Sequence, residues 1–344
     1  MSFREALDRF KRGPADVVGI DVGSTSVKAV RMRRGDSGAA EVLAARVMPP
    51  VSLPDLQSGS PAEAPALDLD PEFRAKYACL TVSGREAVVK LLSFPGQFDE
   101  KAEQKVVDNM GLDKPDDYRI SYKLISEGHG RSESRVLTVA LREKQAAVLP
   151  LMLPAGPPAP YSLEISGLAA MAAFLRSAGA AHSNGAVGVV EFSARVTTFA
   201  LFNRNVLALV RRFSFGTEAL LEKVQNTLGV DRETAQGIVT DGSFDISQSV
   251  SDIMEPLIKQ LIVSRDFVER RENCRIEGIY ASGGLALSHD SLAEIKSSME
   301  IDVTAWNPFE NLNVADRALP KDLAGQEWRF AAAVGACLGT FEET

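Results

Sequence analysis

The sequence predicts an α/β protein built from two copies of one β-β-β-α lobe, with a small α+β unit inserted into the first copy. Residues 16–50 and 186–216 both follow the order strand, turn, strand, turn, strand, which indicates a long internal duplication. Proline-rich stretches at 49–71 and 153–160 set off the segment between them. Helical patterns then follow the second copy.

The first lobe begins within residues 1–48. Ser2 and Glu5 form a capping box, so a short amphipathic helix is expected to open the chain. Strands are expected at 17–23, 26–35 and 39–50. Residues 49–71 carry six prolines and few large apolar side chains. We expect a flexible linker there, because so little apolar surface cannot offset the entropy lost on ordering.

The inserted α+β unit is expected to span residues 72–150. Residues 77–95 alternate as a β-hairpin would, with its turn at the sequence SGRE. A helix and two more strands follow at 98–111, 118–128 and 134–143. The first lobe is then expected to resume over 151–183 with an apolar helix.

The second lobe is expected to span residues 184–327. After its three strands come helical patterns and a strand that runs into a glycine pair, at 217–229, 231–242, 250–272 and 276–288. Residues 328–344 form a closing helix of small residues, which we expect to return to the first lobe.

Composition excludes several classes of protein. The formal net charge of −8 argues against a general nucleic-acid binder, because phosphate contacts need a basic surface. The three cysteines lack CxxC spacing and the three histidines are scattered, so neither a disulfide framework nor a zinc site is expected and a reducing cytoplasm fits. No apolar run approaches the ~20 residues of a membrane helix, and the first residues lack a signal-peptide core.

The turn in "DVGSTSVK" has the chemistry of a phosphate site. Gly23 lets backbone N–H groups point at an anion, and the hydroxyls of Ser24, Thr25 and Ser26 can donate to phosphate oxygens. Asp21 is a candidate to hold a hydrated Mg²⁺ through water, and Lys28 to pair with a phosphate. The alternative is an ordinary β-hairpin, whose turn also favours glycine and serine.

The glycine pair in "SGGLA" is the second candidate site. Gly283 and Gly284 stand between a strand and a probable helix, where two glycines allow close approach of a flat ring or a ribose. The alternative is a tight turn with no ligand.

These motifs, in this order, resemble the actin-like ATPase superfamily, and within it the PilM family of type IV pilus assembly proteins. The resemblance covers nearly the whole chain and implies an actin-like, ribonuclease H-like fold that binds ATP and Mg²⁺. It also implies the roles of specific residues. The first phosphate turn would be Asp21, Gly23, Ser24, Thr25 and Lys28, the adenosine turn Gly283, Gly284 and Ala286, and the glycine after the third strand of the second half Gly216.

The second phosphate turn departs from the family pattern. Glu191 replaces its aspartate, Ser193 replaces its glycine and Arg195 adds a bulky cation, while Thr197 keeps a hydroxyl for the nucleotide. Arg195 would either block the site or pair with a phosphate. In the helix over the adenosine, Gln236 and Val239 stand where the family has Glu and Lys. We therefore assign no catalytic residue and expect weakened ATP binding with little or no ATPase activity.

The resemblance implies a cytoplasmic scaffold that is peripherally associated with the inner membrane. Its partner would be the N-terminal cytoplasmic peptide of a bitopic inner-membrane pilus-assembly protein, held in a groove beside residues 72–150 and the helix that follows Ser162. The resemblance leaves open whether the chain forms a homo-oligomer and whether the machine is a type IV pilus or a related type II secretion system. The alternatives are an active actin-fold ATPase or small-molecule kinase, and an FtsA-like filament-forming protein.

Overall fold

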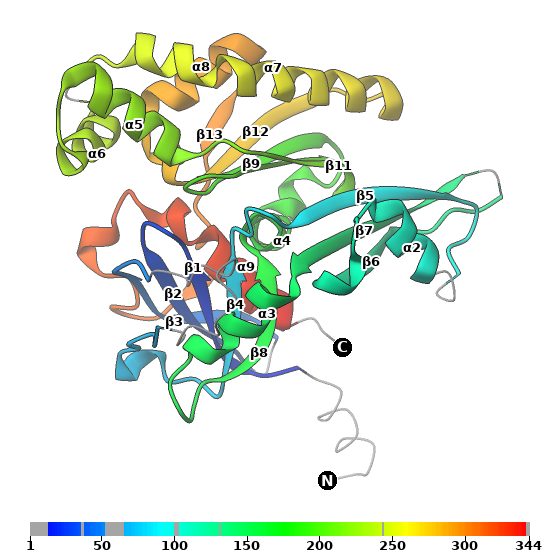
Figure 1. Cartoon of the computed structure of the whole chain (residues 1–344), viewed down its shortest axis with the longest axis horizontal. Coiled ribbons are helices and arrows are strands. Elements are labelled where there is room, and N and C mark those ends of the chain that lie inside the picture. Colours follow the sequence, from blue (N-terminus) through cyan, green and yellow to red (C-terminus); the bar gives the residue numbers. More distant parts are fainter. Residues whose placement is uncertain are drawn as a thin grey trace.

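The computed structural model describes residues 13–35, 38–51, 65–99, 103–130, 132–242 and 244–341. These residues form three sheets, in the strand orders β14-β3-β2-β1-β4-β8, β11-β10-β9-β12-β13 and β5-β7-β6. Figure 1 shows the five-stranded sheet above the six-stranded sheet, with the three-stranded sheet projecting to one side. The predicted helix at the start of the chain lies outside the described residues.

The six-stranded sheet holds the first copy of the repeat. Its strands are β1 (Asp16–Val22), β2 (Val27–Arg34), β3 (Ala40–Met48), β4 (Tyr77–Val82), β8 (Ala159–Ile165) and β14 (Asn313–Val314). β1, β2 and β3 form an antiparallel meander, while β4 pairs in parallel with both β1 and β8. β1 and β4 occupy the middle of the sheet and are buried almost throughout, which fits their continuous apolar sequences.

The five-stranded sheet repeats this arrangement. Its strands are β9 (Ala186–Phe192), β10 (Thr197–Asn203), β11 (Val206–Phe213), β12 (Ile276–Gly283) and β13 (Val303–Ala305). The order β11-β10-β9-β12-β13 matches β3-β2-β1-β4-β8, with the same parallel and antiparallel pairs. Asp21 pairs with Lys28 across the first turn as Glu191 pairs with Thr198 across the second. The duplication predicted from sequence is therefore present in strand order, direction and register.

The inserted three-stranded sheet begins later than the sequence predicts. It contains β5 (Val88–Pro95), β6 (Tyr118–Ser126) and β7 (Glu133–Arg142), with α2 (Glu103–Met110) beside it and α3 (Glu143–Val148) after it. The predicted hairpin at 77–95 is wrong, because β4 and β5 belong to different sheets. Five successive residues of β4 are buried, which requires a place inside the large sheet, whereas β5 is half-exposed along most of its length.

The end of the predicted linker is packed against the first lobe. Leu67 and Leu69 are only 3% and 7% exposed and belong to the core under the six-stranded sheet. The backbone N–H of Leu67 also donates to the carbonyl of Met152 at 2.7 Å. The prediction of a flexible segment is thus wrong for this part of residues 49–71, while residues 52–64 lie outside the described part of the chain.

Small residues join the last helix to the first lobe. α9 (Ala331–Thr340) packs against β1 and α4 (Ser166–Ser177). A Cβ built on Gly335 would lie 1.8 Å from the carbonyl oxygen of Ala169, and one on Gly19 would lie 2.1 Å from that of Ala333. Only glycine allows these approaches, so the small-residue pattern of α9 is a packing requirement.

Helices α5 (Thr217–Leu228), α6 (Arg232–Asp241), α7 (Ser247–Glu272) and α8 (His289–Met299) accompany the five-stranded sheet on its outer side (Figure 1). The end of α7 contacts the inserted sheet through the ion pairs Arg135–Glu272 and Arg271–Glu133. Neither α7 nor any other helix in the described part of the chain has the length and apolarity needed to cross a membrane.

Candidate functional site

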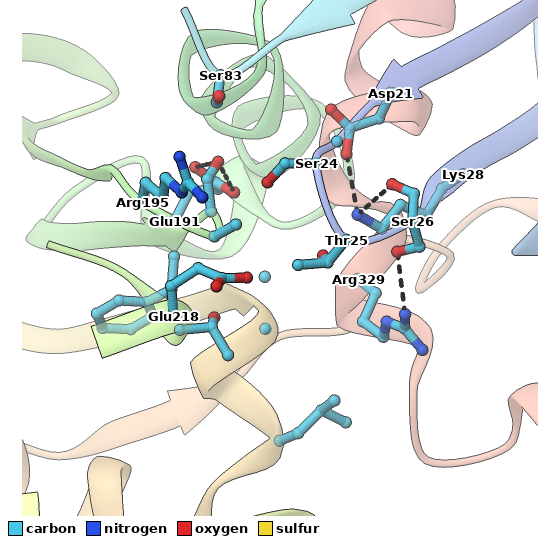
Figure 2. A pocket seen from close by; sticks show the side chains of 18 of the residues that line it. Asp21, Ser24, Thr25, Ser26, Lys28, Ser83, Glu191, Arg195, Glu218 and Arg329 are labelled. Carbon is cyan, nitrogen blue, oxygen red and sulfur yellow. Dashed lines mark hydrogen bonds and ion pairs between the residues drawn. The ribbon is translucent and has the colours of Figure 1, made fainter. Parts of the chain in front are cut away.

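A cavity of about 410 Å³ lies between the two lobes, where their turns face each other. Its walls come from the β1–β2 turn, the β9–β10 turn, the starts of α5 and α6, the end of β12 and the start of α9. Figure 2 shows Ser24 and Thr25 between Lys28 on one side and Glu191 with Arg195 on the other. Both predicted phosphate turns therefore border one cavity.

The first turn presents its hydroxyls to this cavity. Ser24 and Thr25 are exposed, whereas Ser26 is buried beneath them. A Cβ on Gly23 would lie 2.7 Å from the carbonyl oxygen of Ser26, so this turn closes only with glycine at that position. The arrangement leaves two hydroxyl donors facing the space that an anion would fill.

The carboxylate of Asp21 has three partners within the protein. Its Oδ1 accepts hydrogen bonds from the hydroxyls of Thr81, at 2.9 Å, and Ser166, at 2.7 Å. Its Oδ2 pairs with the ammonium of Lys28 at 3.4 Å. Asp21 thus connects the first turn to β4 and to the start of α4, and it forms an ion pair with Lys28.

This network leaves little acceptor capacity for a hydrated Mg²⁺ beside Asp21, the metal site expected from sequence. Mg²⁺ held through water would need an acceptor lone pair of the Asp21 carboxylate, and Thr81, Ser166 and Lys28 already use three of its roughly four. A metal-bound water that displaced one of these partners would leave a buried hydroxyl or an ammonium without its acceptor.

The second turn carries a neutral carboxyl group at the position equivalent to Asp21. The hydroxyl of Ser193 contacts both Oε atoms of Glu191, at 3.0 and 3.1 Å. Burial raises the pKa of Glu191 to about 8, the nearby charge of Asp21 adds to this increase, and the Ser193 hydrogen bond opposes it. Glu191 is therefore largely protonated at pH 7.

Two predicted ligand residues of the second lobe stand outside the cavity wall. Thr197 is fully buried, and its hydroxyl donates to the carbonyl of Phe215 at 2.9 Å. A Cβ on Gly216 would lie 2.4 Å from the carbonyl oxygen of Ser193, so this glycine supports the second turn from below. Both residues thus contact the protein interior in this structure, and a nucleotide contact from Thr197 or Gly216 stays a prediction.

The predicted glycine pair does line the cavity. Gly283 has φ +85°, and a Cβ there would lie 2.2 Å from the carbonyl oxygen of Phe192. A Cβ on Gly284 would lie 2.4 Å from Oγ1 of Thr217. Thr217 and Trp328 also line the cavity. The hydroxyl of Thr217 and the indole N–H of Trp328 are buried and have no hydrogen-bond partner among the described residues, so they are unsatisfied donors in the cavity wall.

Comparison with known proteins decides the family. Residues 116–341, more than half of the chain, match the family model described as type IV pilus assembly protein PilM. The chain belongs to the PilM family. Its fold also matches the solved structure titled "PilM-PilN type IV pilus biogenesis complex", with a TM-score of 0.77 and 18% sequence identity over 96% of this chain and 100% of that chain. The PilM-family chain therefore has the actin-like fold.

Other structural matches are more distant. The ethanolamine utilization protein EutJ from Carboxydothermus hydrogenoformans has a TM-score of 0.46 and 13% identity over 95% of this chain and 91% of that chain. The archaeal actin homolog Ta0583 has a TM-score of 0.43 and 11% identity over 94% and 98% of the two chains. No curated protein matches the sequence.

Glu218, Arg232, Trp328 and Arg329 are among the cavity residues of the PilM-family chain that sequence reasoning missed. Glu218 and Arg232 form an ion pair with two hydrogen bonds between the starts of α5 and α6. Arg329 donates to the hydroxyl of Ser26 at 3.3 Å and to the side-chain oxygen of Gln326 at 2.6 Å. For Trp328 and Arg329 the sequence offers one signal, which is that these two large residues stand shortly before a helix of small residues.

A buried arginine links the second lobe to the segment before the inserted sheet. Arg212, on β11, donates to the backbone carbonyls of Ser83, Gly84 and Ala87. Burial lowers the pKa of the Arg212 guanidinium, and the charge of Glu191 opposes this decrease. Because Ser83 lines the cavity and Ala87 precedes β5, this arginine lies between the cavity and the inserted sheet.

Proposed function

We propose that this PilM-family chain is a cytoplasmic scaffold of a pilus or related secretion machine. It would hold the short cytoplasmic tail of a single-span inner-membrane protein and thereby stay at the membrane surface. The observation that carries this proposal is the family match together with the fold shared with the PilM–PilN complex. The name PilN belongs to that complex, and here it defines the kind of partner to test.

The docking site we propose lies along β8, the strand with which the first lobe resumes after the inserted sheet. β8 is an edge strand of the six-stranded sheet, so one side of its backbone is open to pair with an added strand. Tyr161 is exposed on this strand, and Leu151, which is 69% exposed, stands in the segment just before it. An extended peptide with apolar side chains would gain backbone hydrogen bonds from β8 and apolar contacts from these two residues.

A labelled peptide tests this site. The probe is a fluorescein-labelled peptide of the cytoplasmic N-terminus of the PilN homologue from the same organism, followed by fluorescence anisotropy. We expect saturable binding that weakens at least about tenfold, or ~1.4 kcal/mol, in Leu151→Asp and Tyr161→Ala. Val263→Asp is the matched control, because Val263 is an exposed apolar residue on α7. Failure of the wild-type protein to bind the peptide contradicts the proposal, and an equal loss in the control contradicts the site.

We further propose that the cavity binds ATP with little or no turnover. The hydroxyls of Ser24 and Thr25 and the backbone at Gly23 would contact phosphates, while the nucleoside would lie against Gly283 and Gly284, beside the unsatisfied donors of Thr217 and Trp328. Glu191 is the candidate for a general base that would activate the attacking water. Its carboxyl group is largely protonated at pH 7 and accepts a hydrogen bond from Ser193, so we expect it to be a poor base. Equilibrium dialysis with ATP and steady-state phosphate release test this pair of expectations, and robust phosphate release would favour an enzyme instead.

A further inference from the structure

Two of the four basic side chains in the cavity wall have no acidic partner. Lys28 pairs with Asp21, and Arg232 pairs with Glu218. Arg195 and Arg329 also line the cavity, but neither forms an ion pair with any carboxylate in the described part of the chain. The cavity thus holds two guanidinium groups whose charge the protein itself leaves unpaired.

These two arginines approach the first turn from different parts of the fold. Arg195 belongs to the turn between β9 and β10, and Arg329 to the segment that leads into α9. In Figure 2 they stand on opposite sides of Ser24 and Thr25, the two exposed hydroxyls. An anion that contacted these hydroxyls would lie between two cations.

Arg329 is held in place although it is costly to bury. Its guanidinium contacts Ser26 and Gln326, both neutral partners. Burial lowers the pKa of the Arg329 guanidinium, which means that its charge is poorly solvated where it stands. A phosphate would remove this penalty, because guanidinium groups bind phosphate oxygens with two parallel hydrogen bonds.

We propose that the cavity binds a nucleoside triphosphate without Mg²⁺, with Arg195 and Arg329 neutralising the phosphate charge in place of the metal. The proposal rests on the ATP binding proposed above and adds the residues and the metal requirement. It also agrees with the contacts of Asp21, whose carboxylate holds Lys28, Thr81 and Ser166 and so has little acceptor capacity left for a metal-bound water.

The test measures ATP affinity by equilibrium dialysis of the full chain, in excess EDTA and in millimolar Mg²⁺. We expect the affinity in EDTA to equal or exceed that in Mg²⁺, because the metal competes with the arginines for phosphate oxygens. Arg195→Gln and Arg329→Gln should each weaken binding about tenfold or more in both buffers. Arg33→Gln is the control, because Arg33 is exposed on β2 and pairs with Glu41 outside the cavity.

Each outcome bears on a different part of the argument. Binding in Mg²⁺ that disappears in EDTA overturns this inference and leaves the proposed ATP site standing, whereas no binding in either buffer overturns both. Arg329→Lys retains the charge, so it should bind more tightly than Arg329→Gln, and thermal melts identify a variant that has merely unfolded. Wild-type affinity in both glutamine variants also overturns the inference.

Discussion

The two turns that face the cavity have the same backbone plan but differ in side-chain chemistry. Four residues separate the last paired residues of each hairpin, Val22 with Val27 and Phe192 with Thr197. Gly23 and Thr25 of the first turn correspond to Ser193 and Arg195 of the second. The first turn therefore keeps open hydroxyls, while the second has a side chain in place of the glycine and a cation in place of a hydroxyl.

The equivalent carboxyl groups diverge in the same way. Asp21 accepts hydrogen bonds from two hydroxyls and pairs with an ammonium. Glu191 has one hydroxyl neighbour and no ammonium within ion-pair distance in the described structure, and burial keeps it protonated at pH 7. Duplicated backbones can thus preserve strand register while the partners of one side chain decide whether it carries charge.

The largest expected effect is on the free energy of unfolding, when each of these two carboxyl groups is removed by mutation. Asp21→Ala leaves the ammonium of Lys28 and two buried hydroxyls without their acceptor, so we expect a loss of ~3 kcal/mol or more in the free energy of unfolding at pH 7. Glu191→Gln removes a group that is already neutral, so it should cost less than about 1 kcal/mol. Urea unfolding measures both, and equal losses would refute the asymmetry between the turns.

The next effect is the pH dependence that Glu191 imposes. Its pKa is about 8 in the folded state, above the ordinary value of 4.5, so the native state binds the proton more tightly than the unfolded chain does. This contribution to stability is complete below about pH 4.5 and is lost as pH rises through about 8. The slope approaches roughly 1.4 kcal/mol per pH unit between these values.

Urea unfolding from pH 6 to 8.5 measures this slope, with Glu191→Gln as the reference. The groups that act on the Glu191 carboxyl are Asp21, Lys28, Ser193 and Arg212, and all of them remain in the variant. The wild-type protein should therefore lose stability relative to Glu191→Gln as pH rises. Parallel curves would mean that Glu191 is ionised throughout.

The sequence allowed the repeated part of the fold to be predicted, because a duplication supplies its own comparison. The strands on both sides of Gly23 and Ser193 follow from one pattern seen twice. The segment 77–95 was not recognised as part of the duplication, although its first strand, β4, has a counterpart in β12. Its apolar run fits a hairpin as well as a central strand, and only the burial of β4 between β1 and β8 decides between them.

The candidate site was predictable where its residues are close in sequence. Asp21, Gly23, Ser24, Thr25 and Lys28 lie on one turn, and the structure brings them to the cavity with the glycine pair. Arg329 was missed because it is 303 residues from Ser26, its partner. Side-chain direction was the other limit, since neither the spacing nor the residue type of Thr197 reveals that its hydroxyl turns to Phe215.

The smallest expected effect comes from replacing Thr197 by valine. This change makes the second hairpin more like the first, which has Val27 at the equivalent position. Thr197→Val keeps the shape of the side chain and removes the hydrogen bond to the carbonyl of Phe215, so we expect a loss of ~1 kcal/mol in the free energy of unfolding. ATP affinity should not change, because this hydroxyl lies outside the cavity wall. Urea unfolding and equilibrium dialysis on the same preparation give both values. A tenfold loss of ATP affinity would return Thr197 to the nucleotide site, because its hydroxyl would then have to turn from Phe215 toward the ligand on binding.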